Sequence, residues 1–204
     1  MVSYDTYHRI EHTLNVSGLP PVDISDNPLT NDYEAVNLLM ATKQANHYYP
    51  STNIGGGMQD AIALLDEHGR SGARPNIILM TDGNANVYES YSLPSGWADN
   101  FNGYDGPGST YDIWSGGASS SVANARGFLI AEVIEAVGKG YTIHTIAVGV
   151  DADANLMKAI AYYAGGEFIH VSGGTSVEEM EGQMLAAFHK IAGLVPPAKL
   201  LGPE

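Results

Sequence analysis

A chain of 204 residues, 44% hydrophobic and 16% charged, can bury a sizeable core as one large domain. Its 23 acidic residues outnumber 9 basic ones, and the net charge of -14 argues against binding nucleic acid or an anionic membrane by electrostatics. The absence of cysteine excludes disulfides, zinc thiolate sites and cysteine nucleophiles, and no run approaches the ~20 apolar residues of a membrane-spanning segment.

The first residues alternate apolar and polar side chains, which is typical of half-buried strands. We expect residues 2–4 and 10–16 to pair as a hairpin that turns at Asp5 and Thr6. Residues 18–28 contain three prolines and are predicted to form a loop. The chain therefore opens with one antiparallel hairpin.

Two helices are predicted next. Asn31 and Glu34 have the spacing of a capping box, which predicts a helix that ends near Asn46. The second helix follows a glycine run, and its apolar stripe is formed by Ala61, Ile62, Leu64 and Leu65.

The run from Asn76 to Gly83 organises the rest of the chain. Ile77 to Met80 are consecutive apolar residues without polar alternation, as in a strand that is buried on both faces. Asp82 stands at the carboxyl end of this strand, where open α/β folds place their ligands. Asp82 is therefore the first candidate site residue.

The segment 87–117 has no sustained period and is rich in Gly, Tyr, Asp, Asn and Ser. A loop of this length is usually functional or mobile. Aromatic side chains give contact area at low entropic cost, so we interpret the loop as facing a partner; the alternative is a loop that packs on its own domain. The residues of this loop that we expect to contact the partner are Trp97, Tyr104, Tyr111 and Trp114.

Helices and strands alternate in the second half, with helices expected at 122–137, 151–164 and 176–191 and strands at 141–150 and 167–171. This order predicts an α/β fold: a Rossmann-like, doubly wound, mostly parallel sheet with helices on both faces and the one antiparallel hairpin at its edge. The domain is expected to cover residues 1–193, with 194–204 as a tail or linker.

The loop from Ser51 to Gly57 precedes the second helix and is expected to lie at the same sheet edge as Asp82. The Thr52 hydroxyl and the Asp82 carboxylate would then offer the hard oxygen ligands that Mg²⁺, Ca²⁺ or Mn²⁺ prefer. Thr-Asp-Gly is also ordinary turn chemistry, so a metal-free site stays open. The surrounding residues would be Ser51, Asn53, Gly83 and Asn84.

Several of these motifs resemble the von Willebrand factor type A (vWA) domain. Thr52 to Met58 is similar to its threonine loop, and Ile77 to Gly83 to its central strand and aspartate loop. Tyr141 to Gly149 and Gly165 to Phe168 resemble its closing strands, and the resemblance runs from residue 2 to about 193. It implies a metal-ion-dependent adhesion site in which Thr52 and Asp82 help to hold a divalent cation, and an acidic side chain of a protein partner completes the coordination.

The Asp-x-Ser-x-Ser loop of that family has no counterpart here, because Asn15 to Leu19 and Asp23 to Asn27 both depart from its pattern. The resemblance therefore implies an N-terminally incomplete vWA-like domain that lacks the first strand and helix. We expect cation binding to be weak or absent, one strand edge to be unpaired and apolar surface to be exposed. Self-association through the exposed sheet is one expected outcome.

These features favour a non-enzymatic protein-binding or adhesion module of a bacterial surface or pilus-assembly protein, located at the cell surface or otherwise outside the cytoplasm, although a cytoplasmic location stays open. His144 and His170 fall in predicted strands and are expected to be structural. One alternative is a structural domain with a degenerate, metal-free site. Another is a flavodoxin-like enzyme with residues 51–57 as a phosphate loop, which requires a strand that leads directly into Ser51.

Overall fold

The computed structural model describes residues 1–43, 49–101, 120–172 and 176–194. The helices are α1 Tyr33–Ala41, α2 Ile54–His68, α4 Ser120–Gly138, α5 Ala154–Tyr163 and α6 Val177–Leu194, with a 3₁₀ helix, η1, at Trp97–Phe101. The strands are β1 Val2–Tyr4, β2 His8–Ile10, β3 Thr13–Leu14, β4 Val22–Asp23, β5 Asn76–Thr81, β6 Thr142–Val148 and β7 Phe168–Val171. No helix among these residues is long and apolar enough to cross a membrane.

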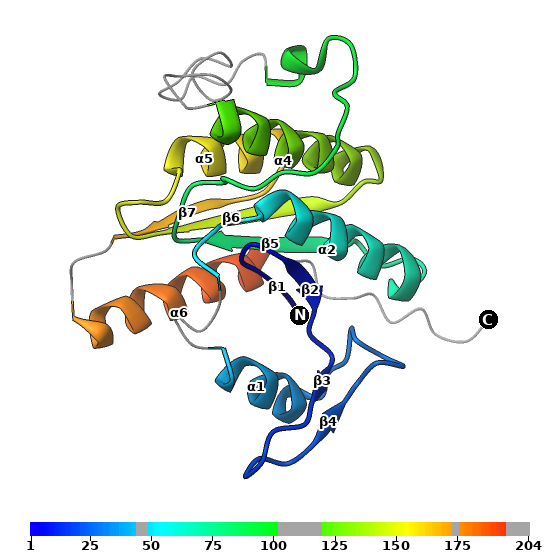
Figure 1. Cartoon of the computed structure of the whole chain (residues 1–204), viewed down its shortest axis with the longest axis vertical. Helices are drawn as coiled ribbons and strands as arrows, with labels where there is room; N and C mark the ends of the chain where they lie inside the picture. The colour runs from blue at the N-terminus through cyan, green and yellow to red at the C-terminus, as the bar shows by residue number, and fades with distance from the viewer. Residues whose placement is uncertain (44–48, 102–119, 173–175, 195–204) are drawn as a thin grey trace.

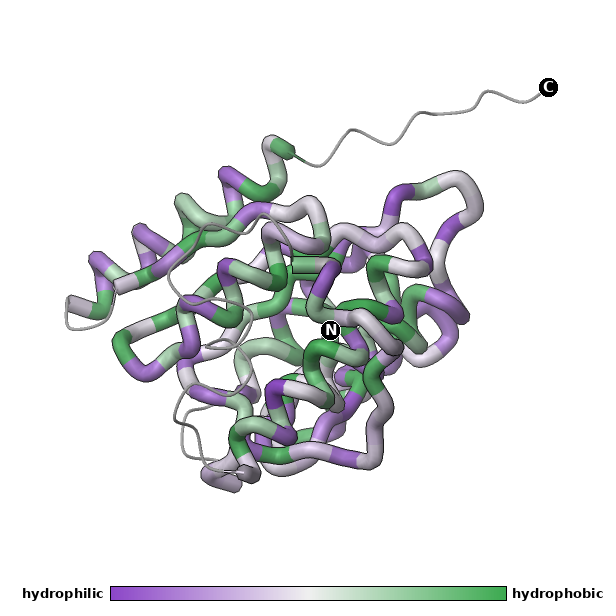
Figure 2. Tube along the Cα trace, turned by 90° about the horizontal axis from the view of Figure 1, so that it is seen from above, coloured by the Kyte–Doolittle hydropathy of each residue, from purple (hydrophilic) through white to green (hydrophobic). Residues whose placement is uncertain are grey.

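The central sheet is parallel, in the order β5-β6-β7, with Met80 beside Ile146 and Ile146 beside Ile169. Helices α2, α4 and α5 pack on one face of this sheet, and α6 packs on the other (Figure 1). The expected α/β class with a parallel sheet between helices is confirmed. Figure 2 shows hydrophilic and hydrophobic residues alternating along α6, as its position between sheet and solvent requires.

The amino terminus differs from its prediction, because it forms two antiparallel hairpins instead of one. In the described part of the chain β1 pairs with β2, and β3 pairs with β4. The predicted second strand is divided after Ile10, because the backbone at His12 accepts a hydrogen bond from Ile24 and so turns toward β4. The segment expected to be a loop therefore contributes a strand, whose Val22 packs with Leu14 in a small separate core.

The expectation that β5 is buried on both faces is wrong. Ile77, Leu79 and Thr81 are buried, whereas Ile78 and Met80 are 41% and 43% exposed. Met80 lies beside Ile146 and therefore points to the same face, but α6 covers that face only over β6 and β7. Helices thus cover the apolar run on one face, and its other face is exposed to solvent.

Local chemistry fixes where the helices begin. Asp32, not the predicted Asn31, caps α1 and accepts a hydrogen bond from the Ala35 amide. Asn53 caps α2 through the Gly56 amide at 2.9 Å. A Cβ on Gly57 would lie 2.5 Å from the Tyr4 ring, and one on Gly56 would lie 2.3 Å from the His8 ring. The glycine run therefore lets the β1–β2 hairpin pack directly against the first turn of α2.

Candidate functional site

Two loops that lie far apart in the sequence meet beyond the carboxyl end of β5. The Thr52 amide donates to Asn86 Oδ1 at 2.7 Å, and the Asn86 amide donates to the Thr52 carbonyl at 3.1 Å. The Thr52 hydroxyl lies 3.5 Å from the place that a Cβ on Gly83 would occupy. The structure thus brings Thr52 beside the Asp82–Gly83 turn.

The turn itself is shaped by Thr81. The buried Thr81 hydroxyl accepts from the Gly83 amide at 3.3 Å and donates to the Gly83 carbonyl at 3.1 Å. Asp82 is exposed, and among the described residues no hydrogen bond or ion pair involves its carboxylate. Burial raises the pKa of Tyr4, and a hydrogen bond with Thr81 partly offsets this effect. The nearby negative charge of Asp82 raises the pKa further. Asp82 is therefore a free carboxylate close to the end of β1.

The residues expected around this pair have mainly structural contacts. The Asn53 side chain caps α2, and its amide donates to the Asp5 carbonyl at 2.7 Å. Asn84 Nδ2 donates to the Asp151 carbonyl at 3.0 Å, which ties the loop after β5 to the loop after β6. Ser51 is half-buried. These contacts hold the loops in place. The Thr52 hydroxyl and the Asp82 carboxylate are left as the oxygen ligands that a cation could use.

These two side chains supply few of the ligands that a divalent cation needs. Thr52 and Asp82 supply one hydroxyl and one carboxylate, and the described part of the chain contains no cluster of three or more His, Asp or Glu side chains arranged to hold a metal. Mg²⁺ commonly keeps several waters and binds through one or two carboxylates. The two side chains thus suit a hydrated, weakly held Mg²⁺ ion.

Of the four residues expected to face a partner, Trp97 is the one that the structure describes. Its ring stands edge-on to Phe101, with 6.2 Å between ring centroids, and Phe101 lies 5.0 Å from the Tyr163 ring. Phe101 is buried and Trp97 packs against the main core, so at this position the loop packs on its own domain. Tyr104, Tyr111 and Trp114 lie outside the described residues.

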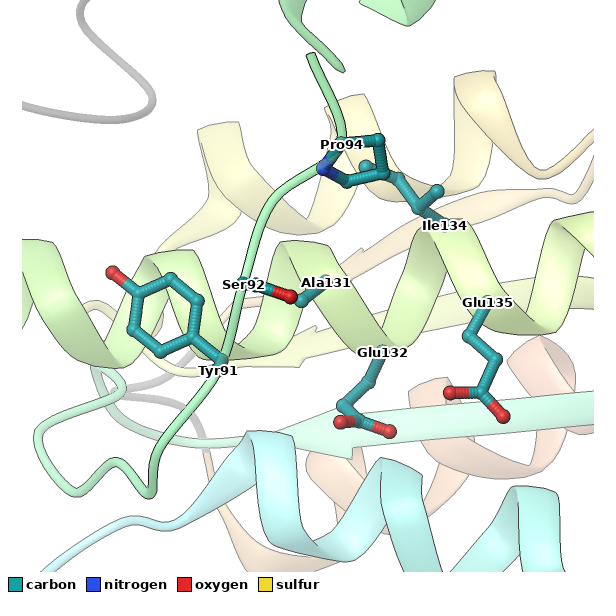
Figure 3. Close-up of a pocket in the computed structure, with 7 residues that line it drawn as sticks. All are labelled: Tyr91, Ser92, Pro94, Ala131, Glu132, Ile134 and Glu135. Atoms are coloured by element: carbon teal, nitrogen blue, oxygen red, sulfur yellow. The ribbon is translucent and has the colours of Figure 1, made fainter.

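A second polar cluster was not found from the sequence. The His8 ring lies 2.9 Å from Asp60 through Nδ1 and 3.1 Å from Glu89 through Nε2. Glu132 on α4 is only 8% exposed and lines a hollow of about 300 Å³ beside Tyr91 and Glu135 (Figure 3). No sequence spacing reveals this cluster, because its members come from β2, α2, α4 and the loop after β5.

Burial and the nearby Glu135 and Glu89 carboxylates raise the pKa of Glu132 to about 7, while His8 acts in the opposite direction. Burial lowers the pKa of His8, but hydrogen bonds and charge from Asp60 and Glu89 outweigh it and raise the pKa above its ordinary value. The cluster therefore places His8 between two carboxylates that favour its protonated form, and the largely buried Glu132 lies alongside.

His144 and His170 lie in β6 and β7 as predicted. His144 Nδ1 accepts from the Glu167 amide at 3.1 Å, and its Nε2 lies 3.2 Å from Asn76 Oδ1. Burial lowers the pKa of His144, which favours the neutral ring that this pair of contacts needs. His170 Nε2 lies 3.0 Å from the Gly149 carbonyl. These contacts support the structural roles predicted for both histidines.

Comparison with known proteins gives a fold but no family. No protein-family description and no curated protein matches the chain. A solved structure described as PilB minor pilin from Streptococcus sanguinis is 18% identical, over 99% of this chain and 50% of that one, with a TM-score of 0.52. An uncharacterized membrane spanning protein from Vibrio fischeri is 17% identical over 82% of this chain and 68% of that one, with a TM-score of 0.34.

The chain spans half the length of the pilin structure that it matches. At this level of identity the match establishes a shared fold over nearly the whole chain and leaves partners and activity to other evidence. Neither structure is described as a vWA domain.

Proposed function

We propose that this chain is a non-enzymatic protein-binding module with a vWA-like fold, carried by a bacterial surface or pilus-associated protein. The fold shared with a minor pilin supports the surface location and the pilus association. The vWA-like motifs quoted above support the type of domain. The net charge of -14 makes a protein partner more suitable than nucleic acid.

The proposed binding centre is the pair Thr52 and Asp82. Their oxygens would hold a hydrated Mg²⁺, or Mn²⁺ or Ca²⁺ in its place, and an acidic side chain of the partner would bind to the cation. The observation that carries this proposal is the reciprocal pair of hydrogen bonds between Thr52 and Asn86, which holds the threonine loop against the aspartate turn before any ligand arrives.

Titration with Mn²⁺, followed by calorimetry and by water-proton relaxation, tests the binding centre. We expect the unaltered chain to bind one Mn²⁺ with a dissociation constant on the order of 10⁻³ M and Asp82→Asn to lose at least about tenfold in affinity. Asp26→Asn, which removes an exposed carboxylate from an N-terminal turn, is the matched control. Equal weakening in both variants would mean general attraction of cations to an acidic surface.

The metal-free alternative assumes the same fold, and it differs from the proposal in the result that it predicts for the Mn²⁺ titration. If the unaltered chain shows no saturable Mn²⁺ binding, the domain is structural and its partner does not depend on a cation. The Asp82→Asn variant would then bind partners as well as the original chain.

The flavodoxin-like alternative is disfavoured by the surroundings of α2. Residues 49–53 are irregular, so no strand runs into Ser51. The first turn of α2 is buried from Ile54 to Met58, and the Gly56 amide is already bound by the Asn53 side chain. A phosphate-binding helix start needs free, accessible amides, which this one does not offer.

A further inference from the structure

Glu132 of α4 is an almost buried carboxylate that lines an open hollow. The residue is 8% exposed, and in the described part of the chain no hydrogen bond or ion pair involves its side chain. Its oxygens are not fully enclosed, so the carboxylate opens on the hollow that it lines. Buried polar groups in folded proteins are generally hydrogen-bonded, and an ionised one needs a partner of opposite charge. Glu132 therefore offers its acceptors to whatever enters the hollow.

The hollow lies between α4 and the loop that follows β5 (Figure 3). Glu132 and Glu135 extend from α4 in the same direction, because residues three apart share one face of a helix. The volume of the hollow is about 300 Å³, roughly that of ten water molecules, which is enough for a side chain or a small organic molecule. The rest of its lining is aromatic, small or apolar and consists of Tyr91, Ser92, Pro94, Ala131 and Ile134.

Tyr91 fixes the loop against α4. Its hydroxyl lies 3.5 Å from Asn124 Oδ1, and its ring lies 6.3 Å from the Phe128 ring, between centroids, with the two planes tilted by 33°. Phe128 is itself buried, and Leu93 of the same loop packs against the main core. The wall of the hollow is thus preformed, and a preformed wall lowers the ordering cost of binding.

Acidic groups surround Glu132. Glu135 lies on the same helix and Glu89 in the loop after β5, and the charges of both disfavour ionisation of the Glu132 carboxylate. A cation that entered the hollow would relieve this repulsion between like charges. The site therefore favours a positively charged ligand.

The basic side chains close to this site are engaged with other acids. The His8 ring lies 2.9 Å from Asp60 of α2, and Lys139 Nζ lies 2.8 Å from Asp66. His8 partly offsets the acidic surroundings of Glu132, but no ion pair joins the two among the described residues. An excess of negative charge is left at the hollow, and it attracts cations.

The lining distinguishes between kinds of cation. In the part of the chain that the structure describes, no group of three or more His, Asp or Glu side chains is arranged to hold a metal ion. Apolar surfaces such as those of Pro94 and Ile134 suit an aliphatic chain, as when lysine buries its stem and keeps its ammonium group among polar partners. An ammonium group has three donors, and ionised carboxylates only accept. Glu132 and Glu135 therefore complement an alkylammonium group.

We propose that this hollow binds a primary ammonium group on an aliphatic chain, as the side chain of lysine carries it. The ammonium group binds to the Glu132 and Glu135 carboxylates, and the aliphatic chain packs on Pro94, Ala131 and Ile134. A lysine of a partner protein and a free alkylamine share this chemistry. The proposal goes beyond the cation centre described above and does not depend on it.

Protonation of Glu132 couples to this binding. Burial and the nearby Glu135 and Glu89 carboxylates raise the pKa of Glu132 to about 7, whereas an alkylammonium group keeps its proton up to about pH 10. Raising the pH from 6 to 8 therefore ionises Glu132 and leaves the ligand charged, so affinity should rise by up to about tenfold. His8, whose pKa is raised by Asp60 and Glu89 against the effect of burial, loses its charge as pH rises and acts in the same direction.

Titration with n-butylammonium chloride, followed by NMR, tests the site. At pH 8 we expect saturable shifts of the Ser92, Ala131 and Glu132 backbone amides and a dissociation constant on the order of 10⁻³ M. 1-Butanol has the same chain without the charge and should bind at least about tenfold more weakly. N-acetyl-lysine methylamide separates the two sources: binding equal to that of n-butylammonium assigns the hollow to a lysine of a partner protein, and much weaker binding assigns it to a free alkylamine.

Glu132→Gln keeps the shape of the side chain and removes its charge. It should weaken n-butylammonium binding at pH 8 at least about tenfold and remove most of the rise in affinity between pH 6 and pH 8; the rise that remains measures the contribution of His8. Glu181→Gln makes the same change at an exposed position of α6, on the other face of the sheet, and should alter neither quantity. A spectrum that matches the unaltered chain verifies that each variant is folded.

Three results would overturn the proposal. The first is equal weakening in Glu132→Gln and Glu181→Gln, because binding would then be a general attraction of cations to an acidic surface. The second is equal binding of 1-butanol, because the hollow would then recognise only the apolar chain. The third is a set of shifts that leaves the amides of α4 and of the loop after β5 unchanged, because the amine would then bind elsewhere.

Discussion

Thr52 and Asn86 are joined by two hydrogen bonds, one from each backbone amide, although 34 residues separate them in the chain. One bond uses the Asn86 side chain, and a substitution can remove it without disturbing the other. The relationship can therefore be tested separately from the overall fold.

Asn86→Ala should lower the free energy of unfolding by about 1 kcal/mol, because the Thr52 amide loses its acceptor while the backbone bond stays. If Thr52 and Asp82 form the cation centre, the same variant should also weaken Mn²⁺ binding, since the threonine loop is held less firmly. Urea unfolding and Mn²⁺ titration measure the two effects. Asn15→Ala, at an exposed loop position, is the control and should change neither quantity.

The Glu132 cluster should make stability depend on pH. Glu132 has a pKa of about 7 in the folded chain against 4.5 ordinarily, so the folded state binds more protons between these values and its stability falls as pH rises through this range. The raised pKa of His8 acts in the same direction, because its contribution is complete below about 6.5 and is lost at higher pH.

Glu132→Gln should therefore be more stable than the unaltered chain at pH 8, by about 1 to 3 kcal/mol, and the two should converge toward pH 4.5. Thermal unfolding across pH 4 to 9 measures this difference. Glu135→Gln, at a more exposed position of α4, should show a much smaller effect. Parallel stability curves for Glu132→Gln and the unaltered chain would mean that Glu132 ionises normally.

Much of the framework could be predicted from the sequence, because it depends on local signals. The strand β5 coincides with a continuous apolar run, and the apolar stripe of Ala61, Ile62, Leu64 and Leu65 falls within α2, although that helix begins before the glycine run and not after it as expected. The meeting of Thr52 with the Asp82 turn also follows from a simple rule: a helix that leads into a strand of a parallel sheet runs antiparallel to that strand, so the loop before α2 lies at the carboxyl end of β5.

The exposure of Met80 and the clustering of His8 with Glu132 could not be predicted in this way. The apolar run at β5 carries no sign of whether a helix covers each face, since that depends on where α6 packs. His8 and Glu132 come close because Gly56 and Gly57 let the hairpin lie against α2, and Gly55 lets Phe128 of α4 approach the same helix. The division of the N-terminal hairpin was missed because Val22, a strand residue, lies among prolines.

Gly166 should tolerate no side chain. A Cβ there would lie 1.9 Å from the Ile143 carbonyl oxygen, which is fixed backbone of the central strand. Gly166→Ala should therefore cost at least about 3 kcal/mol, as expected for overpacking against an immobile neighbour. Gly182→Ala is the matched change in the interior of α6, where nothing lies within 4 Å, and it should stabilise the chain by up to about 1 kcal/mol. Urea unfolding measures both, and similar values for the two would contradict this packing.

Arg126 and Asp153 form a largely buried ion pair at 2.6 Å between α4 and the start of α5, with side chains 13% and 10% exposed. Asp153 also caps α5 through the Leu156 amide. Asp153→Asn should keep the cap, because an asparagine oxygen can accept the same bond, but it leaves the arginine charge buried. The expected loss is about 3 kcal/mol.

The double variant Arg126→Met with Asp153→Asn should recover most of that loss, because it removes the uncompensated charge. Lys190→Gln breaks the exposed pair with Glu167 and should cost less than about 0.5 kcal/mol. Chemical unfolding of the four chains separates these effects. If Asp153→Asn costs no more than Lys190→Gln, then the Arg126 charge is reached by water and the pair contributes as a surface pair does.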